Sequence, residues 1–194
     1  MEIFVQEIVK EMLQYGLVTE EEKENYCYYI EILLEKVIGI GSIILISFIL
    51  DKVIQMLFLM CSFSSIRRYS GGFHCKSFLG CYFLSLMVCG MGVCPFFIDS
   101  IFRNQTVTLM TTLLSMIVLF MIGAVNHPNM SWDIQEMQHS KDMARSMTAL
   151  MGSLVFSIEY LGIFSQYVNY LAEGIWISAG SVFVAKIIRQ EVKI

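Results

Sequence analysis

The chain has 194 residues, of which 56% are hydrophobic and only 15% are charged. A soluble domain of this length carries about 25% charged residues, so the composition excludes an ordinary soluble domain. The net charge of −4 gives no basic surface, and we expect no nucleic-acid partner. We predict an all-α integral membrane protein that forms a single polytopic domain over residues 1–194.

The first 24 residues form an acidic, amphipathic segment with seven Glu and two Lys. Apolar residues recur in it with helical spacing at Val5, Ile8, Val9, Met12 and Leu13, which predicts a helix over residues 2–14. This helix either packs against the protein or lies in the membrane interface in contact with lipids. Next, Thr19-Glu20-Glu21-Glu22 has the pattern of a capping box and predicts that a second helix starts there.

Six apolar runs are candidate membrane spans: residues 37–50, 53–66, 78–98, 106–125, 147–164 and 167–185. A helix needs about 20 residues to cross the hydrocarbon, and the third and fourth runs meet that length. Only Asp51 and Lys52 separate the first two runs, which form either a hairpin or one long span. We predict about six transmembrane helices; the alternative is four spans with re-entrant segments.

The placement of Lys and Arg predicts the orientation, because cytoplasmic segments are enriched in both. With six spans and cytoplasmic N- and C-termini, eleven basic residues lie inside and only Lys52 and Arg103 lie outside. This topology places residues 67–81 at the cytoplasmic face, followed later by a cytoplasmic loop over residues 126–146. Thiols stay reduced on that side of the membrane.

The segment 67–81 holds the residues best suited to chemistry. It contains two arginines, a glycine pair, a histidine, a serine and two cysteines: Arg67, Arg68, Gly71, Gly72, His74, Cys75, Ser77 and Cys81. A nearby imidazole raises the fraction of reactive thiolate, so this combination indicates nucleophilic catalysis. In the alternative interpretation, the arginines are anchors at the membrane surface, His74 lies in the interface and Cys81 only packs.

The spacing of His74 and Cys81 sets a structural condition for a catalytic pair. On one straight helix their Cα atoms would stand about 10.5 Å apart along the axis, with His74 leaning away from Cys81. Contact therefore requires a helix that begins after His74, near residues 75–77, and Gly71-Gly72 permits the necessary turn. Cys75 is a rival nucleophile, but neighbours in sequence point in different directions.

In this hypothesis Cys81 is the nucleophile, and His74 is the base that later protonates the leaving amine. Arg67 or Arg68 binds a substrate carboxylate or supports an oxyanion. Ser77 donates a hydrogen bond or caps the helix. No third catalytic residue stands out; the candidates are Glu31, Glu35 and Asn126.

Two glutamates carry the main rival hypothesis. Glu159 and Glu173 lie inside apolar runs, where ionisable residues mark proton or ion pathways, so the alternative function is a small transporter or channel. A metal site has little support, because Glu136 and His139 form one Glu-x-x-His element and a carboxylate-bridged di-metal site needs two. We expect no metal and no cofactor.

The pattern Arg67-Arg68-x-x-Gly71-Gly72-x-His74, followed by Ser77-Phe78 and Cys81-Tyr82, resembles the accessory gene regulator protein B (AgrB) family of bacterial membrane cysteine endopeptidases. The resemblance extends to the chain length, the amphipathic N-terminal segment and the order of spans. It implies that His74 and Cys81 are catalytic and that Arg67 and Gly72 are required. It further implies a homodimer in the bacterial cell membrane.

The resemblance also implies a role in peptide quorum sensing. The enzyme would cleave the C-terminal tail from a short AgrD-type precursor through an acyl-thioester and promote its cyclisation to a thiolactone or lactone autoinducing peptide. The chain departs from the family at Cys75, where small residues such as Ala are common. It departs again in the 126–145 loop, which is acidic where better-known members are rich in lysine, so the substrate preference stays open.

Overall fold

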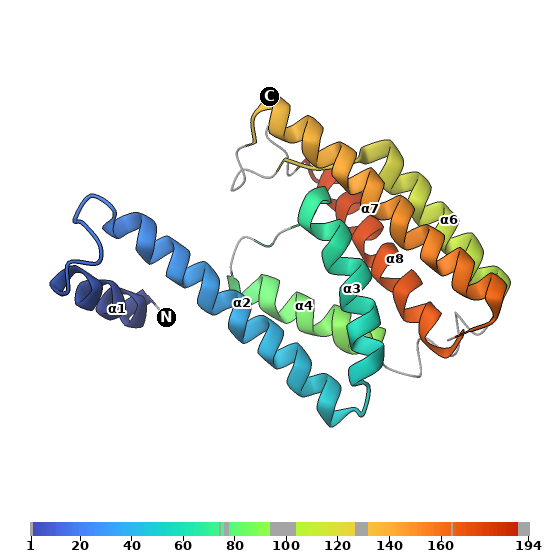
Figure 1. Ribbon diagram of the computed structural model, residues 1–194, viewed down its shortest axis with the longest axis horizontal. Helices are drawn as coiled ribbons and strands as arrows, with labels where there is room; N and C mark the ends of the chain where they lie inside the picture. The colour runs from blue at the N-terminus through green and yellow to red at the C-terminus, as the bar shows by residue number, and fades with distance from the viewer. Residues whose placement is uncertain are drawn as a thin grey trace. The chain divides into compact units, whose positions relative to one another are not determined.

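The computed structural model of the chain describes residues 2–73, 75, 78–93, 104–126, 132–163 and 165–189. This part of the chain contains helices and no β-strand, which confirms the predicted all-α class (Figure 1). The helices are α1 (Glu2–Gln14), α2 (Lys23–Ile49), α3 (Val53–Ser70), α4 (Phe78–Gly92), α6 (Gln105–Ile122), α7 (Ile134–Leu161) and α8 (Ser165–Ile187). They divide into two compact units, Met1–Leu45 and Ile46–Ile194.

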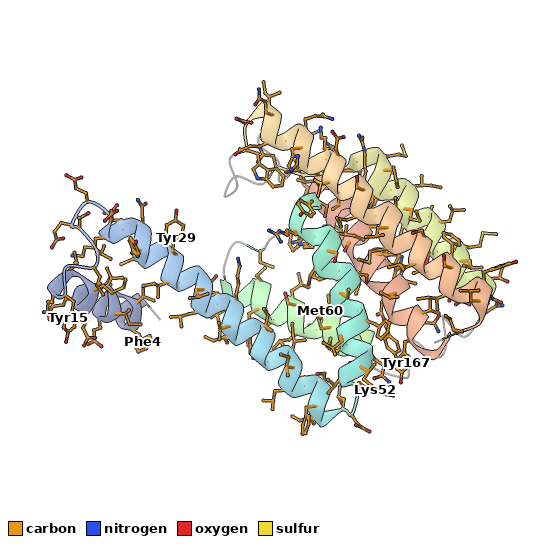
Figure 2. All side chains as sticks on the ribbon, in the orientation of Figure 1. Phe4, Tyr15, Tyr29, Lys52, Met60 and Tyr167 are labelled. Atoms are coloured by element: carbon orange, nitrogen blue, oxygen red, sulfur yellow. The ribbon has the colours of Figure 1, made fainter. Side chains whose placement is uncertain are left out.

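In the first unit, α1 is the predicted amphipathic helix. Val5 and Val9 are buried, while the charged residues of the opposite face are exposed. Phe4 and Tyr15 also lie on the surface (Figure 2). The helix stops before Gly16, whose left-handed φ of 66° is favourable only for a residue without a Cβ atom. The prediction of a helix over residues 2–14 is confirmed.

The second helix starts later than predicted. The Thr19 hydroxyl donates a 2.8 Å hydrogen bond to the Glu22 carboxylate, and the Thr19 N–H donates to the same oxygen at 3.2 Å. Because the hydroxyl donates to Glu22 instead of accepting from its N–H, only half of a capping box forms. Residues 19–22 are a turn, and α2 begins at Lys23.

A tight turn separates α2 from α3, so the alternative of one long span is wrong. Asp51 takes a left-handed φ of 54°. The Lys52 N–H donates a 2.8 Å hydrogen bond to the Ser47 carbonyl, which closes the turn. Asp is among the few residues that tolerate this conformation.

Three described helices are long and apolar enough to cross a membrane: α2, α6 and the Tyr167–Ile187 stretch of α8. The apolar stretch Leu79–Gly90 of α4 is shorter. Apolar side chains of α2 and α6, such as Leu45 and Leu114, are exposed, as expected for surfaces that face lipid. The chain is an integral membrane protein, whereas the count of six spans stays a prediction.

The second unit is built around α8, which packs against α3, α6 and α7 (Figure 1). Most residues of the hydrophobic core belong to α8: Val168, Leu171, Ala172, Ile175, Ala179, Val182 and Ala185. Ile66 of α3, Leu119 of α6 and Val155 of α7 complete the core on three sides. α8 is therefore buried over most of its surface, with Trp176, Phe183 and Ile187 on its exposed face, whereas α2 is largely exposed.

Contacts along the helices give their directions. The ring of Phe58, early in α3, stacks on that of Tyr167, early in α8, at 5.4 Å (Figure 2). Arg67, late in α3, bonds to Ser181, late in α8, so α3 and α8 run parallel. Thr108 of α6 donates to Asn169 of α8 at 3.1 Å, close to the start of both helices.

In contrast, α7 runs antiparallel to α6. Gln105, at the start of α6, donates a 3.3 Å hydrogen bond to the carbonyl of Glu159, at the end of α7. Arg145, in the first half of α7, donates to the Phe120 carbonyl at the end of α6. In a six-span chain, α3, α6, α7 and α8 would be spans two, four, five and six. Such a chain requires α3, α6 and α8 to run in one direction and α7 in the other, and these are the directions observed.

α3 and α8 approach each other closely at Gly174. A Cβ atom there would overlap the Ser62 hydroxyl and lie 2.5 Å from the Leu59 carbonyl oxygen. Small residues bring helix backbones into close contact, which is the main source of packing energy where no water is available to be excluded. Ser178, one turn later, donates to the Gly174 carbonyl of its own helix, so its small side chain lies close to the α8 backbone.

The predicted loop over residues 126–146 is wrong in its second half, because α7 already begins at Ile134. Asp133 is the N-cap: its carboxylate accepts from the Glu136 N–H at 2.7 Å, and the Glu136 carboxylate accepts from the Asp133 N–H at 3.0 Å. This reciprocal pair is a complete capping box. Glu136 is thus engaged in starting a helix, a role that the Asp-x-x-Glu spacing already signals.

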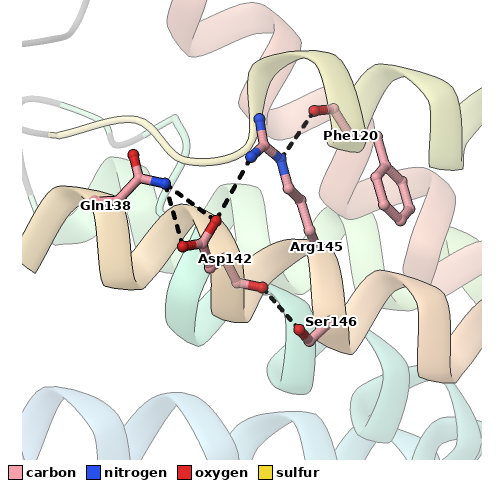
Figure 3. Close-up of polar contacts among 5 residues, drawn as sticks. All are labelled: Phe120, Gln138, Asp142, Arg145 and Ser146. Atoms are coloured by element: carbon pink, nitrogen blue, oxygen red, sulfur yellow. Dashed lines mark hydrogen bonds and ion pairs between the residues drawn. The ribbon is translucent and has the colours of Figure 1, made fainter.

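The first turns of α7 also secure the end of α6 (Figure 3). The Arg145 Nε donates a 3.2 Å hydrogen bond to the Phe120 carbonyl, one of the last carbonyls of α6, where the helix dipole is negative. Asp142 holds the guanidinium at 3.6 Å and accepts from the Gln138 amide at 3.2 Å. The polar half of α7 therefore has a structural role at this end of the unit.

We expect Gly174→Ala to destabilise the second unit by about 1–3 kcal/mol, the usual cost of overpacking a close contact. Gly180→Ala on the same helix is the matched control, because a Cβ atom at Gly180 meets nothing within 4 Å. Thermal unfolding of the detergent-solubilised protein measures the difference. Equal melting temperatures for the two variants would contradict the packing described here.

Candidate active site

The helix is interrupted where the sequence requires it. α3 ends at Ser70 and α4 begins at Phe78, and between them Gly71 and Gly72 take φ values of 63° and 124°. The condition that a helix begins after His74 is therefore met. His74 and Ser77 themselves lie outside the described residues, and their predicted roles stay predictions.

Arg67 holds the chain in this turn. Its Nη1 donates a 2.7 Å hydrogen bond to the Gly71 carbonyl, and its Nη2 donates a 2.5 Å hydrogen bond to the Phe73 carbonyl. The same Nη1 also donates to the hydroxyl of Ser181 on α8. A guanidinium presents its donors in a fixed planar fork, so these bonds fix the segment 71–73 relative to both α3 and α8.

Two further contacts attach this segment to the core. The Phe73 N–H donates both to the backbone carbonyl and to the hydroxyl oxygen of Ser181, each at 3.1 Å. On the other side, Gly71 pairs with Val125 in an isolated parallel bridge, and the Val125 N–H donates to the Ser70 carbonyl at 2.9 Å. The segment is thus held by α8 and by the residues that follow α6.

Only glycine fits at position 72. The φ of 124° is strained for any residue with a Cβ atom. In addition, a Cβ atom there would overlap Arg67 Nη1 and lie 2.8 Å from the Ser181 hydroxyl oxygen. The close approach of the arginine, rather than the turn alone, therefore requires Gly72.

Cys81 lies in the first turn of α4 and is half-buried. Arg67 supplies a positive charge in this region. Burial lowers the pKa of Arg67 to about 10, and the electrostatic interaction with Cys81 acts in the opposite direction. The guanidinium therefore stays protonated at neutral pH.

The two predicted substrate-binding arginines differ in their surroundings. The Arg67 guanidinium is bonded to the protein as described, whereas Arg68 is exposed and lies 5.7 Å from the ring centre of Tyr69. Cys75, the rival nucleophile, is half-buried and lies outside both helices. None of the described cysteines is in a disulfide bond.

Comparison with known proteins gives one result. The family model for accessory gene regulator B matches residues 1–185. The chain belongs to the AgrB family. No curated protein and no solved structure matches it. Membership of this family supports a role in the processing of a quorum-sensing peptide and gives the geometry around Cys81 a chemical context.

Asn126, a candidate third catalytic residue, is buried and 1% exposed. Its amide nitrogen donates to the Trp132 carbonyl at 3.0 Å, and its oxygen accepts from the Trp132 N–H at 3.1 Å. Both ends of the side chain thus close the connection between α6 and α7. The other two candidates, Glu31 and Glu35, lie on α2 in the first unit.

The two glutamates of the rival hypothesis lie in different surroundings. Glu173 is 7% exposed, and one of its carboxylate oxygens has no hydrogen-bond partner among the described residues. A Cβ atom on Gly92, at the end of α4, would lie 2.8 Å from the other oxygen. Glu159 is half-exposed near the end of α7, where its carbonyl accepts from Gln105.

We expect Gly72→Ala to lower peptide processing by about 100-fold, the effect of displacing reacting groups by roughly 1 Å. The reason is the overlap of the new methyl group with Arg67. Gly90→Ala on α4 is the control, since a Cβ atom there meets nothing within 4 Å. Processed peptide is quantified per membrane-inserted protein. Equal activity of the two variants would show that the turn tolerates a side chain.

Proposed function

We propose that the protein is a membrane cysteine endopeptidase and peptide cyclase. It cleaves the C-terminal tail from a short AgrD-type precursor and promotes closure of the remaining peptide to a thiolactone or lactone. Cys81 is the nucleophile and His74 is the general base and acid. The proposal rests on family membership and on the geometry of the segment that joins α3 to α4.

One observation carries the assignment. The chain between α3 and α4 leaves the helix at Gly71 and is fixed up to Phe73, the residue before His74, while Cys81 lies in the first turn of the next helix. An unbroken helix through this region would have kept the two side chains apart. The interruption removes that obstacle and supports the pair.

The chemistry proceeds through two exchanges at one carbonyl carbon. The Cys81 thiolate attacks the scissile carbonyl, a C–S bond forms, and the peptide C–N bond breaks as His74 protonates the leaving amine. The internal Cys or Ser of the precursor then attacks the acyl-thioester, with His74 taking its proton. The ring bond forms and Cys81 leaves as a thiolate, which restores the starting state.

Exclusion of water is essential to this mechanism, because hydrolysis of the acyl-thioester would release a linear peptide. A site beside apolar helices in the membrane provides such exclusion. Arg67 has a positioning role in the proposal, since its donors are engaged with the segment 71–73 and with Ser181. Arg68, being exposed, is the arginine available to a precursor carboxylate.

We place the site and both termini on the cytoplasmic side of the bacterial cell membrane. The contacts of the second unit bring the basic ends of three helices together: Arg67 of α3 bonds to α8 near Lys186, and the chain after Arg67 pairs with Val125. Lys141 of α7 packs against Gly123, next to that bridge. Basic residues gathered at one end agree with the positive-inside rule. We further propose a homodimer, as the family implies.

Cys81→Ala should abolish release of the precursor tail while leaving membrane insertion intact. Cys75→Ala and Cys89→Ala are the controls, and both should retain processing. The measurement is mass spectrometry of the cognate precursor incubated with the protein in membranes or detergent. Continued cleavage by the Cys81 variant would overturn the proposed nucleophile.

Glu173 supports the second candidate function, a transporter or channel. The Glu173 carboxyl group is buried, and one oxygen has no hydrogen-bond partner in the described part of the chain. Such a group is costly in hydrocarbon and often marks an ion or proton pathway. The two hypotheses separate in one comparison. A peptidase retains precursor cleavage in Glu173→Gln and loses it in Cys81→Ala, whereas a transporter shows the opposite dependence in a flux assay.

A further inference from the structure

The hydroxyl group of Ser181 on α8 contacts both the Arg67 side chain and the backbone that leads to His74. The Ser181 hydroxyl oxygen accepts from the Arg67 guanidinium and from the Phe73 N–H. These donors are 114 and 108 residues away in the sequence. Arg67 interacts electrostatically with Cys81, and Phe73 directly precedes His74.

We propose that Ser181 is a positioning residue of the active site, which holds the Arg67 guanidinium at the turn after α3 and fixes the chain that leads to His74. This inference rests on the function proposed above. Ser181 does not contact the reacting atoms; it acts through the Arg67 guanidinium and the backbone at Phe73. Through these hydrogen bonds α8, which is remote in sequence from residues 67–81, is connected to the site.

Two other buried hydroxyl groups of this unit act as donors. Ser178 and Thr112 each donate at 2.8 Å to the carbonyl four residues earlier in their own helix, which is the common way to satisfy a hydroxyl in a membrane helix. The Ser178 hydroxyl also lies 3.5 Å from the Phe63 carbonyl of α3. The Ser181 oxygen instead accepts two hydrogen bonds from another segment. Its distinct bonding separates positioning from ordinary packing.

The surroundings leave little freedom for a replacement of the hydroxyl by another group. A Cβ atom on Gly72 would lie 2.8 Å from the Ser181 hydroxyl oxygen. The hydroxyl therefore occupies space that is free only because residue 72 is glycine. Its contact with Arg67 is charge-assisted and therefore stronger than a neutral hydrogen bond. Loss of the oxygen would leave one guanidinium donor without this acceptor.

The experiment compares Ser181→Ala, Ser181→Thr and Ser178→Ala in the full-length membrane protein. Ser178→Ala is the matched control, because it removes the buried hydroxyl one turn earlier on the same helix. We expect Ser181→Ala to lower kcat for the cognate precursor by about tenfold, with KM within about twofold. Ser181→Thr, which keeps the hydroxyl, should restore kcat, and Ser178→Ala should behave as the wild type.

A second measurement follows the Cys81 thiol without any precursor. Iodoacetamide alkylation of Cys81, resolved by peptide mass spectrometry across a pH series, reports the thiolate directly. Arg67 of α3 interacts electrostatically with this thiol, and by the proposal His74 acts on it as well. If Ser181 holds Arg67 in place, the alkylation midpoint moves to higher pH in Ser181→Ala and returns in Ser181→Thr.

The outcomes divide cleanly. Wild-type kinetics and an unchanged midpoint in Ser181→Ala, or a loss that Ser181→Thr does not restore, would overturn the positioning role. If Ser181→Ala fails to insert, Ser181→Cys keeps the size with a weaker acceptor, and its failure to insert as well would assign Ser181 to folding instead. A shifted midpoint together with processing that survives Cys81→Ala would uphold positioning and reject the peptidase.

Discussion

The structure around the candidate site depends on one half-buried cation. The Arg67 guanidinium bonds to the Gly71 and Phe73 carbonyls and to the Ser181 hydroxyl. A charge removed from water needs such partners, since an unpaired buried charge is very costly. The carbonyls that satisfy it belong to the segment directly after α3. Two carbonyls at the end of α3 itself, those of Arg67 and Ser70, accept from the Gly71 and Val125 N–H groups.

These contacts are possible because α8 approaches α3 closely. Gly174 lies against the backbone of α3 near Leu59 and Ser62, and the compact Ser178 and Ser181 follow on the same helix. Where helices pack in hydrocarbon, close contact of backbones replaces the hydrophobic effect as the source of stability. Gly152 of α7 makes a similar contact, since a Cβ atom there would lie 2.6 Å from Met116 Cε. The small residues of the bundle therefore determine where the site lies.

Several parts of this arrangement are predictable from local sequence. The amphipathic α1 follows from the side-chain pattern, and the glycine content at Gly71-Gly72 permits the break observed there. At Asp51 the sequence allows either a hairpin or one long span, and only the structure shows the turn. The first half of α7 was missed because its polar residues suggested a loop, although Asp133 and Glu136 carry the spacing of a capping box. The Thr19 pattern shows the opposite error: its hydroxyl donates rather than accepts, which sequence alone does not reveal.

The sequence by itself determined the membrane character and the family, and it predicts residues 67–81 as the place for chemistry, because composition, glycine pairs and the His–Cys spacing are local properties of the chain. Only the tertiary structure decided what Arg67 does and which residues complete the site. Ser181 and Val125 have no local signal, since a serine or a valine in an apolar helix region is ordinary. Their roles arise from the close packing of α8 and of the end of α6 against α3, and such long-range contacts are fixed by the fold as a whole.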